Sequence, residues 1–183
     1  MSTEVVWTQA FTIEDLEEMP DDGRRRELVD GMLIVTPAPG LVHQGCLLSL
    51  AVLLKPALSV DQKVLIAPFD WVAGPRTVFQ PDLLVARRAD VGPHRLERPP
   101  LLVVEVLSPC TRRFDLELKR SAYAEAGVGW YWLVDPAGPG PPCLTVLALD
   151  GGTYVEEASV TGDEPYEAAE PCRVTVVPSA LPD

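Results

Sequence analysis

The sequence is poor in the residues that build metal clusters and disulfide frameworks. It contains two histidines, and its four cysteines are widely separated, at positions 46, 110, 143 and 172. No two cysteines have the CxxC spacing of a structural zinc site, so neither zinc binding nor a disulfide framework is expected. The cysteines are predicted to be separate reduced thiols, partly buried in the core.

Long hydrophobic runs are also missing. No apolar stretch approaches the roughly 18 residues that a membrane-spanning helix needs. The N-terminal stretch MSTEVVWTQAFTIEDLEEMP is acidic and lacks the basic and apolar segments of a secretory signal. These absences predict a cytoplasmic protein without a membrane partner.

Positive charge is scarce. Lys and Arg number 15 against 27 Asp and Glu, which gives a formal net charge of -12. This balance disfavours proteins that coat nucleic acid non-specifically, because phosphate binding needs local positive charge. The basic residues nevertheless cluster, so each cluster is either a solvated face or a local phosphate-binding patch. The clusters are Arg24 to Arg26, Arg87 with Arg88, and Arg112 and Arg113 with Lys119 and Arg120.

The pattern of strand and helix signals predicts a mixed α/β fold. A short helix is expected from Thr12 to about Pro20, and RELVDGMLIVTP predicts a β-hairpin that turns at Asp30-Gly31. A second helix is expected over residues 41–58, and a third, in FDLELKRSAYAEAG, should end at Gly127. Strands are predicted in KVLIAP, FDWVA, PDLLVA, LLVVEVL, GWYWLVD and VTVV, with a further hairpin around residues 150–152.

No internal repeat or linker divides the chain. Residues 1–183 are therefore expected to form one domain. Its core should be a mixed β-sheet flanked by helices, preceded by the N-terminal helix and hairpin.

Two acids stand where chemistry is expected. Glu105 lies inside the apolar run LLVVEVL, and Asp82 opens another predicted strand after Pro81. A buried carboxylate costs several kcal/mol unless it is paired or binds a metal. Acids on neighbouring strands can converge on one Mg²⁺ or Mn²⁺ ion, which would polarise a phosphodiester. A structural ion pair between Glu105 and a basic side chain is the alternative, and these two acids do not decide between them.

The segment after this strand supplies positive charge. If residues 114–126 are helical, Asp115, Lys119 and Tyr123 lie four residues apart on one helix face. Lys119 could then face a metal-bound water or the charge that develops on phosphate. An exposed Asp115–Lys119 pair is the alternative, whereas Tyr123 is expected to pack in the core with a polar tip.

The long string EVLSPCTRRFDLELKRSAYAEAGVGWYWLVDP, with PDLLVA ahead of it and RELVDGMLIVTPAPGLVHQ near the N-terminus, resembles the Uma-type restriction endonuclease family. This family belongs to the PD-(D/E)xK nuclease superfamily, and the resemblance runs from about Phe11 to Pro136. It implies a restriction-endonuclease-like core and cleavage of DNA. It also implies that Asp82 and Glu105 are metal ligands, together with the Val106 carbonyl.

One position departs from the superfamily pattern. The lysine of ExK is replaced by Leu107, and the resemblance suggests that Lys119 takes its place from the following helix. Glu27 is either a third acid of the site or a surface strand acid, and His43 either contacts the site or phosphate or is structural. Asp115 would orient Lys119 or cap its helix. The remaining candidates, which would face phosphate, are Arg112 and Arg113.

Three functions are compatible with these residues. The leading one is a Mg²⁺- or Mn²⁺-dependent endonuclease that acts on DNA, because Asp82, Glu105 and Lys119 are all present. The acidic composition and the displaced lysine favour a non-catalytic DNA-binding or regulatory protein that retains the nuclease fold. RNA or a nucleotide is a third substrate class. A homodimer is expected only by analogy with restriction-type nucleases, and a protein partner could supply the missing positive charge.

Overall fold

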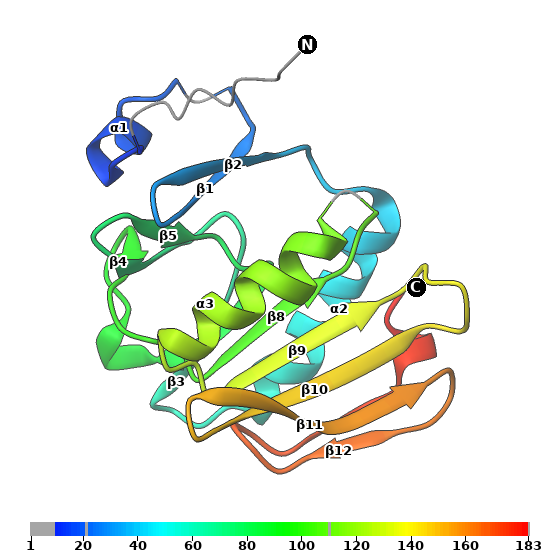
Figure 1. The fold of residues 1–183 in the computed structure, drawn as a ribbon. Helices are drawn as coiled ribbons and strands as arrows, with labels where there is room; N and C mark the ends of the chain where they lie inside the picture. The colour runs from blue at the N-terminus through cyan, green and yellow to red at the C-terminus, as the bar shows by residue number, and fades with distance from the viewer. Residues whose placement is uncertain (1–9, 21, 110, 183) are drawn as a thin grey trace.

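The computed structural model describes residues 10–20, 22–109 and 111–182, and its elements alternate much as the sequence predicts (Figure 1). Three sheets contain the strands β1 (Arg25–Val29), β2 (Met32–Thr36), β3 (Gln62–Ile66), β4 (Asp70–Gly74), β5 (Thr77–Phe79), β6 (Leu83–Arg87), β7 (Arg95–Leu96), β8 (Leu102–Val106), β9 (Trp130–Asp135), β10 (Cys143–Asp150), β11 (Thr153–Thr161), β12 (Tyr166–Ala168) and β13 (Val174–Val176). The helices are α1 (Ile13–Glu17), α2 (Leu41–Ala57) and α3 (Arg120–Glu125), with short helical turns η1 (Arg88–Asp90), η2 (Phe114–Lys119) and η3 (Pro178–Ala180).

The central sheet has six strands in the order β11-β10-β9-β8-β6-β3. Strands β8 and β9 are parallel, and the other neighbours are antiparallel, so the predicted mixed sheet is confirmed. The chain crosses from β8 to β9 through η2 and α3, which lie over one face, while α2 covers the other face (Figure 1). Glu105 therefore lies in a strand that is covered on both sides.

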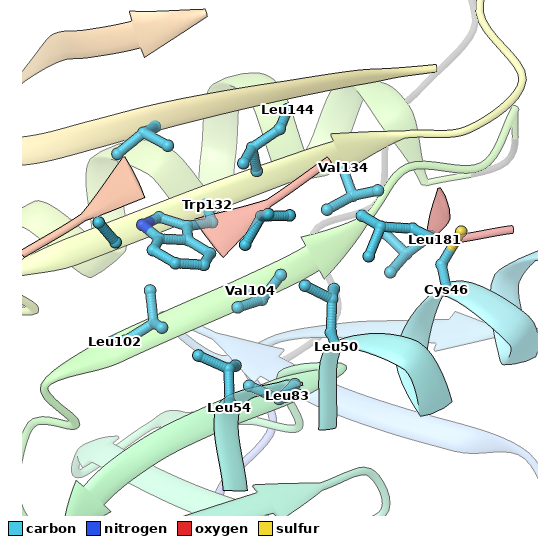
Figure 2. Packing of buried hydrophobic residues seen from close by; sticks show 14 of the residues in the cluster. Cys46, Leu50, Leu54, Leu83, Leu102, Val104, Trp132, Val134, Leu144 and Leu181 are labelled. Carbon is cyan, nitrogen blue, oxygen red and sulfur yellow. The ribbon is translucent and has the colours of Figure 1, made fainter. Parts of the chain in front are cut away.

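Each face of this sheet has its own hydrophobic core. On the α2 face, Cys46, Leu50 and Leu54 pack against strand residues, and Leu181 from the C-terminal segment closes one side (Figure 2). On the α3 face, Tyr123 packs among aromatic side chains, with its ring centroid 4.8 Å from that of Phe79. Because residues alternate along β8, Glu105 points to the α3 face.

The second sheet holds the N-terminal hairpin and has the order β2-β1-β5-β4-β7. The predicted turn is confirmed, because Asp30 and Gly31 both have positive φ, 51° and 82°, as a two-residue hairpin turn requires. Thr12 and Asp15 form a reciprocal capping box at the start of α1. The register of the hairpin fixes which residues of β1 share a face, so Arg25 and Glu27 lie on the same side of the strand.

Some local features differ from the prediction. Residues 114–119 form a π-helical turn instead of regular α-helix, and β5, β7 and β12 were not expected. Pro56 lies inside α2, near its end. Because proline has no backbone N–H, the carbonyl of Val52 loses its helical hydrogen bond, and Val52 is exposed to solvent. The predicted stop at Gly127, with φ 82°, is confirmed.

Cys46, Cys143 and Cys172 are free thiols, as predicted, and Cys110 lies outside the described residues. Among the helices of the described ranges, none is both long and apolar enough to span a membrane.

Candidate active site

Four buried acids from distant parts of the chain line one cavity of about 590 Å³. Strands β1 and β8 carry Glu27 and Glu105, Asp82 directly precedes β6, and Asp115 lies in η2. None of these residues is more than 3% exposed. Carboxylates at such depth need strong partners, since an unpaired buried charge is costly.

Lys119 is the partner that three of the acids share. Its Nζ lies 2.9 Å from Oε1 of Glu105, 3.2 Å from Oε2 of Glu27 and 3.5 Å from Oδ1 of Asp115. The π-helical turn belongs to a kind of helical irregularity that is frequent at functional sites, and here both Asp115 and Lys119 within it are buried. The exposed Asp115–Lys119 pair considered from the sequence is therefore wrong.

Glu105 is fixed by a second donor. The Tyr123 hydroxyl donates to Oε1 of Glu105 at 2.7 Å, while its ring packs on Phe79 and Tyr131. The expectation that Tyr123 packs in the core with a polar tip is confirmed, and its hydroxyl contacts Glu105.

Asp82 accepts hydrogen bonds on both carboxylate oxygens. The Val106 amide donates to Oδ2 at 2.8 Å, and His43 Nε2 lies 3.0 Å from the same atom. Arg25 binds Oδ1 through Nη1 at 2.5 Å. The Val106 carbonyl was expected from the family resemblance to bind a metal, whereas the contact that the structure shows is made by the Val106 amide.

Sequence reasoning missed Arg25. Its Nη2 also lies 3.6 Å from both Oε1 of Glu27 and Oε2 of Glu105, so the guanidinium stands between three acids. From the sequence, the cluster Arg24 to Arg26 was either a solvated face or a phosphate-binding patch, and no contact with the acids was expected. A weak signal existed, because Arg25 directly precedes the predicted stretch RELVDGMLIVTP. It shares a face with Glu27 only if the strand begins one residue earlier.

The carboxylates differ sharply in their affinity for protons. Burial, with the nearby charges of Asp82 and Asp115, raises the pKa of Glu105 to about 8 despite Lys119. Burial also raises the pKa of Asp115. Although burial opposes the charge of Asp82, the His43 hydrogen bond and Arg25 hold its pKa well below the usual range. Similarly, Glu105 and Glu27 outweigh burial and raise the pKa of Lys119, which stays charged at neutral pH.

The charge balance of the cluster bears on metal binding. Four buried acids face two cations, Arg25 and Lys119. When every acid is ionised, two negative charges remain unbalanced, and one divalent ion would balance them. Carboxylate oxygens are also the ligands that Mg²⁺ and Mn²⁺ prefer. In the described part of the chain, no group of three or more His, Cys, Asp or Glu side chains is arranged so that it could hold a metal ion. The residues thus fit such an ion by ligand chemistry, and by charge once Glu105 and Asp115 are ionised. Their present arrangement, with Arg25 between the carboxylates, does not hold one.

The comparisons place the chain within a known family. The profile of the family described as "Uma2: Putative restriction endonuclease" matches residues 13–174, which is most of the chain. The chain belongs to the Uma2 family. Among solved structures, this Uma2 protein resembles one described as a putative nuclease belonging to DUF820 from Anabaena variabilis ATCC 29413. The two chains are 16% identical with a TM-score of 0.69, over 88% of this chain and 89% of the other.

At 16% identity the structural similarity is evidence for a shared fold alone, and this fold agrees with the expected restriction-endonuclease-like core. None of the curated proteins shows significant sequence similarity to this Uma2 chain. Every acid of the cluster, and Lys119, falls inside the matched range.

Two predicted residues lie apart from the cluster. Arg112 pairs with Asp135 through Nη1, and Arg113 pairs with Glu117 on the surface. Neither is among the described residues that line the cavity, where Arg24 and Arg25 supply the arginines instead. His43, in contrast, does line the cavity, which is one of the two alternatives that the sequence left open.

Proposed function

We propose that this Uma2 protein is a metal-dependent endonuclease that hydrolyses DNA phosphodiester bonds with Mg²⁺ or Mn²⁺. The observation that supports it best is the buried cluster of Asp82, Glu105, Glu27 and Lys119 at one cavity. A purely structural ion pair would not need more acids than cations. An excess of buried carboxylates at a cavity supports a site for a divalent cation, because Mg²⁺ and Mn²⁺ prefer carboxylate oxygens.

The ion would be held by Asp82 and Glu105, with Glu27 next to them. When bound, it would supply charge to polarise the phosphate and lower the pKa of a water. The protein's own part is to hold these oxygens still: the Val106 amide and His43 fix Asp82, and Tyr123 fixes Glu105. Lys119, which stays charged, would offset the negative charge that develops on the phosphate.

The substrate class follows from the cavity and the family. A volume of about 590 Å³ lies in the usual range for small-ligand sites and suits one nucleotide unit of a chain. We assign DNA because of the restriction endonuclease description, with RNA as the competing substrate. A homodimer would supply one site for each strand, and a basic protein partner would offset the net charge of -12.

A second candidate function is a DNA-binding or regulatory protein without cleavage. Arg25 favours it, because the guanidinium already ties the acids that a metal would use. The two candidates differ in one measurable property, which is metal-dependent cleavage.

The deciding experiment incubates supercoiled plasmid and single-stranded DNA with the protein at low salt. Wild type is compared with Glu105→Gln and with Glu156→Gln, which removes the same charge from an exposed position on β11. We expect cleavage that needs Mg²⁺ or Mn²⁺, stops with EDTA, falls at least about 100-fold in Glu105→Gln and survives in Glu156→Gln. Cleavage that persists in Glu105→Gln, or that ignores EDTA, would contradict the proposal.

A further inference from the structure

The guanidinium of Arg25 occupies the place where a cation bound by Asp82 and Glu105 would have to lie. It contacts both acids and Glu27, at 2.5 Å from Asp82 Oδ1 and 3.6 Å from the other two carboxylates. A divalent ion would need the same oxygens, and positive charges this close repel each other strongly at a poorly solvated site. Arg25 and the ion are therefore competitors for one place.

Arg25 is held less firmly than the other cation of the site. Contacts of 3.6 Å are too long for hydrogen bonds, so among its three carboxylate partners Arg25 has a close contact only with Asp82. Its buried Nε has no hydrogen-bond partner within the described ranges, and its side chain is 22% exposed. Lys119, at 4% exposure, has close contacts with two acids. Arg25 is thus the cation that can leave.

We propose that Arg25 is a resident cation which the divalent ion displaces, and which then binds the phosphate of the nucleic-acid substrate. This inference rests on the proposed function and concerns the control of the same site. A guanidinium matches phosphate with two parallel hydrogen bonds, and Arg25 already lines the cavity where a substrate would enter. The ion and the substrate then favour each other's binding, because each stabilises the arrangement in which Arg25 has left the carboxylates.

The first test measures Mn²⁺ affinity without nucleic acid, from the electron paramagnetic resonance of free Mn²⁺. Wild type is compared with Arg25→Gln and with Arg26→Gln. Arg26 is the matched control, because it lies on the same strand but binds Asp22 and the Pro20 carbonyl. We expect Mn²⁺ to bind Arg25→Gln about tenfold more tightly than wild type, and Arg26→Gln within about twofold of wild type.

The outcomes separate this inference from the proposed function. Equal Mn²⁺ affinity in wild type and Arg25→Gln, with binding in both, overturns the displacement and leaves the nuclease proposal standing. No Mn²⁺ binding in any of the proteins overturns both.

A second measurement needs no substitution and so does not depend on whether Arg25→Gln folds. The ¹⁵N resonances of the arginine guanidinium groups are recorded in wild type during a Mg²⁺ titration. The Arg25 signals should change and saturate, while those of Arg26 stay constant. Arg25 signals that do not respond in a protein that binds Mg²⁺ would overturn the proposal.

The phosphate contact has its own readout. At saturating Mg²⁺, Arg25→Gln should raise the KM for DNA about tenfold, since a charge-assisted hydrogen bond to phosphate is lost. An unchanged KM would overturn this part of the proposal.

Discussion

At the scale of single residues, the site depends on donors that hold each carboxylate in one orientation. Glu105 could be singled out from the sequence, because a charge inside an apolar run needs a partner. The roles of Asp82 as a metal ligand and of Lys119 as the site cation came from the family resemblance. Only its spacing from Glu27 separates Arg25 from Arg24 and Arg26 in the sequence, and the folded chain shows that Arg25 is the one that binds the site acids.

Tyr123 offers a test of this orientation. In Tyr123→Phe the ring can keep its packing, but Glu105 loses the hydroxyl that donates at 2.7 Å. We expect a loss of about 1–3 kcal/mol in the free energy of unfolding, together with weaker Mn²⁺ binding. The measurements are denaturant unfolding and a Mn²⁺ titration.

The matched control is Tyr131→Phe, which removes a hydroxyl of the same core that donates to the Asp115 carbonyl. This variant should lose similar stability and keep its Mn²⁺ affinity. If both variants change Mn²⁺ affinity equally, Tyr123 has a structural role alone.

At the scale of elements, the hairpin and the π-helical turn decide which side chains reach the cavity. The hairpin was predictable, because Asp30-Gly31 between two apolar stretches is a strong local signal. The π-helical turn was not, because the spacing of its apolar residues also fits a regular α-helix, and its geometry depends on burying Asp115 and Lys119 together. The short β7 and β12 likewise form through tertiary pairing and have little local signal.

The hairpin turn should be sensitive to one added methyl group. Gly31 has φ 82°, and a Cβ there would lie 2.7 Å from Cβ of Ala10. Gly31→Ala is therefore expected to lower the free energy of unfolding by about 1–3 kcal/mol, because strain and a clash act together. Gly151→Ala is the control, since Gly151 also has positive φ, 55°, but a Cβ added there would meet no described atom within 4 Å.

Thermal and denaturant unfolding of both variants would measure the difference. Gly31→Ala should be the less stable, and its β1 strand, which carries Arg25 and Glu27, should exchange its amide hydrogens faster. Equal stability in the two variants would show that the contact with Ala10 is relieved at no cost.

At the scale of the whole molecule, negative charge affects both the approach of DNA and the cavity. The net charge of -12 opposes the approach of DNA over the surface, and the buried acids concentrate negative charge at the cavity. The total was evident from the sequence. The concentration of negative charge at one cavity was expected only in part. Asp82 and Glu105 were expected to converge, but Glu27, which is distant in the chain from both, was left open between the site and the surface and reaches the site through the fold.

A divalent ion should therefore stabilise the fold beyond general screening. Binding to the folded state alone adds about 2.7 kcal/mol when the free ion is present at 100 times its Kd. We expect Mg²⁺ or Mn²⁺ to raise the Tm of wild type more than NaCl of equal ionic strength, which only screens the surface charge. In Asp82→Asn, Mg²⁺ or Mn²⁺ should raise the Tm no more than NaCl does, because a metal ligand is lost while most of the net charge remains. An equal rise with NaCl and Mg²⁺ in wild type would mean that the buried acids bind no ion, and the excess of carboxylates would then have to be balanced by bound protons.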